Sequence, residues 1–137
     1  MHMRAFPMIA AALLLTCPVT AQQEQPLSPD THRNVAILLI DLLAETESCL
    51  AACTDEASVR AALPRLQELA ERARALKAAQ DRLPEPTTQD YMLDQALIQS
   101  FTSTWEALRN QLIRLERTGL MSDEMREILH VAPMDSK

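Results

Sequence analysis

One stretch, residues 87–119, restricts the fold of this sequence most. Its side chains recur at alternating steps of three and four, in the order Tyr91, Asp94, Ile98, Phe101, Trp105, Leu108, Leu112, Leu115. This spacing puts them on one face of an α-helix of roughly 30 residues, or about 45 Å. Every aromatic residue after position 21 lies on this stripe. We therefore expect the other helices to pack against it.

Both ends of this helix carry recognisable signals. Thr87 with Asp90 three residues on has the form of a capping box. Gly119, the only glycine of the chain, stands where a left-handed residue ends a helix. Asp94 breaks the apolar stripe, and three explanations stay open: a wet helix end, a contact with a partner, or a buried pair.

The composition points to helices throughout. A chain of 137 residues suffices for one domain, and its many Ala, Leu, Glu, Gln and Arg residues are helix formers. Residues typical of strands are scarce. We predict an all-α fold: an antiparallel three-helix bundle with a short fourth C-terminal helix. The bundle would cover residues 29–132, with helices at about 29–52, 55–82, 88–118 and 123–131, followed by a tail at 133–137.

Residues 1–21 have the three parts of a secretory signal peptide. Arg4 supplies the positive charge, residues 8–15 the short apolar run, and residues 19–21 a small-residue cleavage site. Cleavage there would be followed by a disordered linker at 22–28 and would place the protein in the periplasm or outside the cell. The alternative of an uncleaved anchor needs a longer apolar run, because a bilayer takes about 20 residues.

A second export signal overlaps the first. Leu14-Leu15-Thr16-Cys17 resembles a bacterial lipoprotein signal in which Cys17 is acylated, and membrane attachment depends on this alternative. The departure from that pattern is Thr16, where Gly, Ala or Ser is usual.

The first predicted helix begins with Ser28 as N-cap and Pro29 in its first turn. Its core seam is Val35, Leu39, Leu42, Thr46, Cys49 and Cys53. Residues 35–43 are apolar on all sides apart from Asp41, which we expect to face solvent. So much apolar surface is buried on several sides or covered by a partner. The candidate interaction surface is the set that one seam does not need: Ile37, Leu38, Ile40 and Leu43.

Cys49 and Cys53 are the two cysteines left after export, and an oxidising compartment allows a disulfide between them. Cβ atoms four residues apart in a helix are roughly 6 Å from each other, whereas a disulfide takes about 3.8 Å. The bond therefore requires the helix to unwind near Cys53. Two buried free thiols are the alternative, and C-x-x-x-C lacks the spacing of redox motifs.

The second predicted helix is capped by Thr54 and interrupted by Pro64, where we expect a kink or a break. It ends near Arg82, because Leu83-Pro84-Glu85-Pro86 cannot continue a helix.

Glu127 and His130 form an E-x-x-H motif, which di-iron bundles use to place both ligands on one helical face. Those bundles need a second such motif and two further carboxylates. His32, the other histidine after position 21, has no Glu three residues before it. A histidine near a helix C-terminus is otherwise favoured by the helix dipole. We expect no metal site and no other cofactor.

Several activities are disfavoured by composition and spacing. The net charge is −6, and removal of residues 1–21 takes away one Arg and no acid, leaving −7. Nucleic-acid binding requires a concentrated basic face. A single glycine cannot form a glycine-rich phosphate-binding loop. The chain contains Ser, His and Asp, but their spacing does not identify a catalytic triad. We therefore predict no enzyme activity and no small-molecule substrate.

The preferred function is a non-catalytic protein-interaction or structural role, with a protein partner or a second copy of the chain on the apolar surface. The alternative is a periplasmic stress chaperone or metal-responsive binding protein. Residues 120–125 are loosely similar to the L-T-x-x-Q motif of helical chaperones, with an insertion and without the final Gln. A cofactor-bearing bundle is a third class.

Overall fold

The structure is a computed structural model that describes residues 27–92 and 94–131. These residues form helices and contain no strand, so the all-α prediction is confirmed for them. The helices are α3 (His32–Ala51), α4 (Glu56–Asp81), α5 (Thr88–Tyr91), α6 (Gln95–Arg117) and α7 (Asp123–Leu129). The predicted signal peptide, most of the linker, Cys17 and the tail at 133–137 lie outside the described residues. None of the described helices combines the length and the apolarity that crossing a membrane takes.

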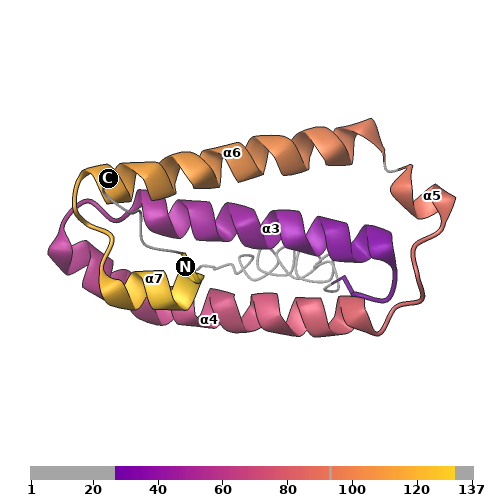
Figure 1. The fold of residues 1–137 in the computed structure, drawn as a ribbon, viewed down its shortest axis with the longest axis horizontal. Coiled ribbons are helices and arrows are strands. Elements are labelled where there is room, and N and C mark those ends of the chain that lie inside the picture. Colours follow the sequence, from indigo (N-terminus) through magenta and orange to yellow (C-terminus); the bar gives the residue numbers. More distant parts are fainter. Residues whose placement is uncertain (1–26, 93, 132–137) are drawn as a thin grey trace, which may run out of the picture.

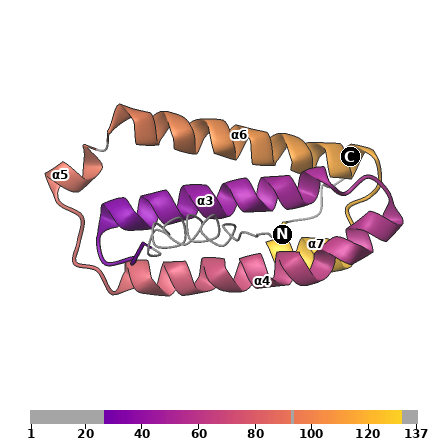
Figure 2. The same ribbon diagram turned by 180° about the vertical axis from the view of Figure 1, so that it is seen from behind.

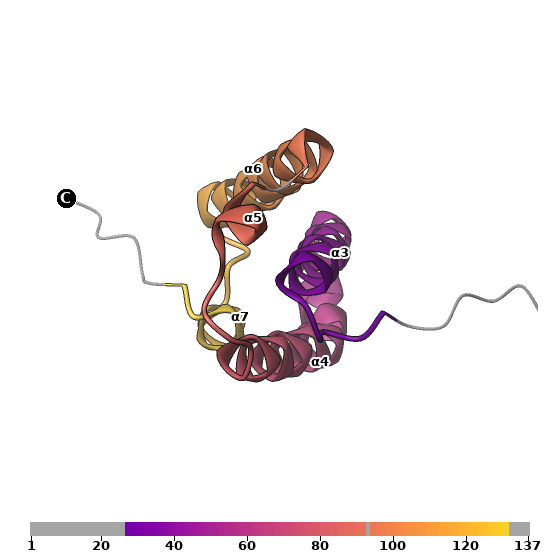
Figure 3. The ribbon, with the colours of Figure 1, turned by 90° about the vertical axis from the view of Figure 1, so that its right-hand side faces the viewer.

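Helix α3 is the central helix. It packs against α6 on one side and α4 on the other, while α7 packs against α4. Helix α4 runs back along α3, and α6 then runs in the same direction as α3 (Figure 1). Seen end-on, α4 and α6 flank α3, and α7 lies beside α4, across from α3 (Figure 3).

The core is concentrated at the end of the molecule that contains α7. Four of its residues are fully buried and come from four different helices: Leu50 of α3, Leu66 of α4, Leu115 of α6 and Met125 of α7. Burying side chains of this size stabilises the fold by roughly 1.5–3 kcal/mol each. The short α7 therefore closes the core at this end.

The long predicted helix at 88–118 is divided in two. After the four residues of α5, the chain leaves helical geometry at Met92, and Asp94 starts α6 as its N-cap. The Asp94 carboxylate accepts a hydrogen bond of 2.9 Å from the backbone N–H of Ala96. A prediction of one continuous helix is wrong here because a helix interior gives a carboxylate no such donor, whereas a helix start does. The polar residue on the apolar stripe thus marks a helix start.

Two other predicted helix starts are displaced. Thr31 caps α3, three residues after the predicted Ser28, and accepts from the backbone N–H of Asn34 at 3.1 Å. Asp55 caps α4 in place of the adjacent Thr54 and forms a capping box with Ser58. The predicted capping box of Thr87 and Asp90 is present at α5.

Helix α4 continues through Pro64 without a break. Proline removes one backbone hydrogen bond and crowds the preceding turn, which bends a helix rather than ending it when both flanks are packed. Figure 2 shows the first part of α4 out of line with the remainder. The kink is thus present and the break is not.

Charged side chains join the helices across two interfaces. Glu45 of α3 accepts hydrogen bonds from Arg65 at 2.6 Å and Arg72 at 2.8 Å, both on α4. On the other side, Glu116 of α6 pairs with Arg126 of α7, in an arrangement with little solvent contact. The Glu116–Arg126 pair joins α7 to α6, whereas the apolar side chains of α7 pack against α4.

Gly119 ends α6 in a Schellman motif. The backbone N–H of Leu120 donates to Leu115 at 2.9 Å, and that of Gly119 donates to Glu116 at 3.2 Å. The motif requires a left-handed residue, and Gly119 has φ of 72°. This turn directs the chain from α6 towards α7.

Replacement of Gly119 tests the turn. A Cβ added there meets no atom within 4 Å, so any loss of stability comes from the backbone conformation alone. We expect Gly119→Ala to lower the free energy of unfolding by about 1 kcal/mol. Gly119→Asn should lower it less, because Asn tolerates this conformation. Urea denaturation of both variants measures the difference, and equal losses would contradict the assignment.

The pairs on Glu45 predict a pH effect. The hydrogen bond from Arg72 lowers the pKa of Glu45 below its ordinary value of 4.5. A lowered pKa means that the pair stabilises the fold above pH 4.5, and that this stability is lost as pH falls through the folded-state pKa. We expect Glu45→Gln to be less stable than the parent at pH 7, by under about 1 kcal/mol because the pair is partly exposed. At pH 3 the difference should shrink. Urea denaturation at both pH values measures this difference in the free energy of unfolding. The control is Glu106→Gln at an exposed position, which should leave the free energy of unfolding unchanged at either pH.

Candidate docking groove

An apolar groove lies between α4 and α6, with α3 as its floor. The larger part is a cavity of about 500 Å³. Six of its apolar lining residues come in pairs from the three long helices: Leu39 and Leu43 of α3, Leu69 and Ala73 of α4, Trp105 and Leu112 of α6. Cavities of this volume and lining are typical of binding sites between helices.

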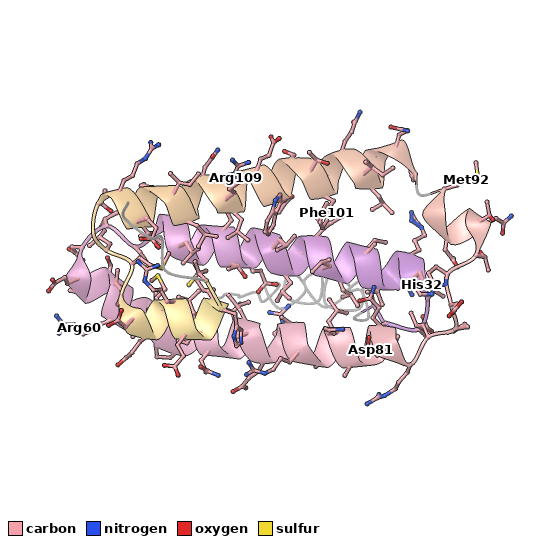
Figure 4. The ribbon with its side chains drawn as sticks, in the orientation of Figure 1. His32, Arg60, Asp81, Met92, Phe101 and Arg109 are labelled. Atoms are coloured by element: carbon pink, nitrogen blue, oxygen red, sulfur yellow. The ribbon has the colours of Figure 1, made fainter. Side chains whose placement is uncertain are left out.

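A second cavity continues the groove towards α5. It has a volume of about 360 Å³ and shares Leu39 with the first. Ile98 and Phe101 of α6 line one side, and Asp90 of α5 lies at its far end. Figure 4 shows Phe101 on the side of α6 that faces α3. Both cavities belong to one groove along the inner faces of the long helices.

The groove exists because α7 is short. Helix α7 packs beside α4 in the position of a fourth helix, opposite α3 (Figure 3). It has 7 residues and α6 has 23, so the two lengths are about 10 Å and 34 Å. About 24 Å of the fourth-helix position is therefore unfilled by α7. We refer to this unfilled part as the open column.

Helix α7 stops at a defined residue. Its C-cap, His130, has φ of 55°, in the left-handed region. The backbone N–H of Val131 donates to the carbonyl of Arg126 at 3.0 Å, which closes the last turn. A left-handed residue ends a helix, so α7 cannot continue along the open column beyond this point.

The apolar residues of α6 at the groove are incompletely covered. Trp105 is 46% exposed, Ile98 42% and Phe101 40%, whereas Leu115 on the same stripe is fully buried. The stripe thus packs in the core only at its C-terminal end. Sequence reasoning assigned all of it to the core and missed this surface. The available signal was that Phe101 and Trp105, two of the three aromatic residues after position 21, lie on the apolar stripe of α6.

The charged groups at the groove are distributed unevenly. The residues that line the larger cavity include Arg74, Lys77 and His130 but no carboxylate. Lys77 also pairs with Asp81, one turn further along α4, at 3.3 Å. At the far end, the ring Nε2 of His32 lies 2.8 Å from the carbonyl oxygen of Pro84. The cationic side chains of the larger cavity, Arg74 and Lys77, therefore lie on the α4 side, and the α6 side is apolar.

The predicted interaction surface is divided by the fold. Ile40 and Leu43 line the groove, one in each cavity. Ile37 and Leu38 are half-buried elsewhere on α3 and line neither cavity. Asp41 is exposed, as predicted. The role of this surface in binding a partner stays a prediction for all four apolar residues. Only Ile40 and Leu43 belong to the groove.

The predicted disulfide is not formed. Cys49 and Cys53 are free thiols, and the Sγ of Cys53 lies 3.5 Å from the backbone oxygen of Cys49. Helix α3 ends at Ala51, so Cys53 lies outside the helix, but its Sγ is directed to the backbone oxygen of Cys49 and not to the sulfur. Burial raises the pKa of both thiols. Neither thiol lines the groove.

The last turn of α3, next to the thiols, is held by Arg114 of α6. Its guanidinium donates to the backbone oxygens of Leu50 at 2.8 Å and Cys53 at 3.0 Å. The Leu50 oxygen also accepts from the backbone N–H of Cys53 at 3.0 Å, so Arg114 reinforces a helix end that the backbone has already closed there. The contact is structural and joins α6 to α3.

The E-x-x-H residues do not form a metal centre with other ligands. Glu127 and His130 are both exposed at the end of α7. Across residues 27–92 and 94–131, no three His, Cys, Asp or Glu side chains are grouped so that they could hold a metal ion. The structure brings neither His32 nor a cysteine to this motif.

If the groove is open, truncating a side chain that lines it should cost less free energy of unfolding than truncating one in the core. Trp105→Ala removes a side chain that is 46% exposed, whereas Leu115→Ala leaves a cavity in the core. We expect the first change to lower the free energy of unfolding by about 1 kcal/mol and the second by about 3 kcal/mol. Thermal and urea unfolding measure both. Equal losses would mean that Trp105 is covered in solution, which contradicts an open groove.

Comparison of the chain with families of proteins, with curated proteins and with solved structures finds no match. The groove is therefore interpreted from its own residues.

Proposed function

We propose that this is an exported, non-catalytic protein that binds an amphipathic helix of another protein in the open column. The observation that carries the proposal is α7 itself. A helix of this chain already occupies one end of the column, between α4 and α6. The column is therefore as wide as a helix, and about 24 Å of it accommodates about 16 helical residues.

The lining of the groove supports a helical ligand. Amphipathic helices bind grooves through apolar side chains spaced three and four residues apart. Ile98, Phe101 and Trp105 have that spacing on α6 and are about half exposed. Such a ligand would remove their apolar surface from water, which favours binding by about 25 cal/mol for each Å² covered. The core at the other end does not depend on this contact.

Trp105 provides the measurement, because it is the only tryptophan of the chain. The probe is a synthetic 16-residue helical peptide with one Leu and Ala stripe. We expect saturable binding with a blue shift of the Trp105 fluorescence. Ala73→Phe, which fills the groove, should weaken binding at least tenfold. The matched control is Ala75→Phe, two residues further on the outer side of α4, and it should bind as the parent does. Equal binding by both variants contradicts the proposed site.

The same measurement separates this function from the chaperone alternative. An open apolar groove also favours a chaperone for unfolded clients, in addition to the similarity of residues 120–125 to a chaperone motif. A scrambled peptide of the same composition has no stripe, so a helix-binding groove should bind it much more weakly. Equal affinity for both peptides would favour the chaperone.

A further inference from the structure

We propose that the partner helix carries two carboxylates one turn apart, along the edge that faces α4, and that these pair with Arg74 and Lys77. This inference rests on the proposed function and specifies the chemistry of its ligand. It follows from the charge on one side of the groove and from the spacing of the two cations.

The charge at the larger cavity is opposite to that of the chain. The whole chain has a net charge of −6, yet the larger cavity has cations and no carboxylate among its lining residues. Arg74 forms no ion pair among the described residues, although it also lines a separate, smaller cavity with Glu124 and Glu127 of α7. Lys77 has only Asp81, a neighbour one turn along its own helix, at 3.3 Å. Acidic groups on a ligand would complement both cations.

The spacing specifies the arrangement of those acidic groups. Arg74 and Lys77 are three residues apart, so they lie on one side of α4. A helix lying along α4 presents side chains at the same interval from its positions i and i+3 or i+4. Across the groove, Trp105, Leu108 and Leu112 of α6 offer no charge. The ligand helix is therefore acidic on one edge and apolar or neutral on the other.

A second copy of this chain is a poorer occupant. In a two-fold dimer the same surface meets itself, so Arg74 and Lys77 of both copies would enter one interface, where the larger cavity has no carboxylate to pair with them. Like charges brought together oppose association. The width of the column, already filled by a helix at one end, favours a helix over a thin acyl chain.

The experiment uses the full chain and two 16-residue helical peptides with the same apolar stripe. One peptide has Glu at two positions four residues apart on one edge, and the other has Lys there. We expect the Glu peptide to bind about tenfold more tightly at 0.15 M salt, as followed by Trp105 fluorescence. The advantage should shrink at 1 M salt, where charges are screened over about 3 Å.

A charge reversal identifies the cations. Arg74→Glu with Lys77→Glu should reverse the preference, so that the Lys peptide binds more tightly. The matched control is Arg60→Glu with Arg82→Glu, which changes the charge equally at exposed positions that line neither cavity. Figure 4 shows Arg60 at the opposite end of the molecule from His32. The control should keep the preference for Glu, and circular dichroism verifies that both variants fold.

The outcomes separate this inference from the proposed function. Equal binding of the two peptides, with a Trp105 shift for each, overturns the acidic edge and leaves the helix-binding function standing. Binding of neither peptide overturns both. A dimer in light scattering with Trp105 covered makes a second copy the occupant, and a Trp105 shift with oleate alone makes it an acyl carboxylate. Either result overturns the inference.

Discussion

The structure depends on one contact in which four helices each contribute a fully buried side chain. Leu50, Leu66, Leu115 and Met125 meet at the end of the molecule where α7 packs. Arg114 and the Glu116–Arg126 pair fasten the same end through hydrogen bonds. Most of what orders the long helices is therefore concentrated in about half of their length.

This uneven distribution explains the groove. Away from the core, α4 and α6 both pack against α3, and α7 no longer lies between them. Ile98, Phe101 and Trp105 continue the stripe that ends in the core at Leu115, but here nothing among the described residues covers them fully. One apolar stripe thus has two environments along its length: it is buried in the core at one end and lines the open groove at the other.

The sequence predicted the helical class, the capping box at Thr87 and the turn at Gly119, because these depend on local residue types and spacing. It did not predict the break at Asp94 or the later start at Thr31, because several polar residues near each helix end compete as caps. The groove was also missed in part. Periodicity shows that Trp105 and Leu115 share a face, but only the length of α7 decides which of them is covered.

The left-handed His130 has a consequence beyond the geometry of one turn. It ends a helix that, if continued by about four more turns, would fill the fourth position along the whole molecule. About 16 helical residues thus separate a closed four-helix arrangement from one in which the fourth position is filled at one end only. The length of one short helix thus sets how much of the apolar inner face of α6 remains in contact with water.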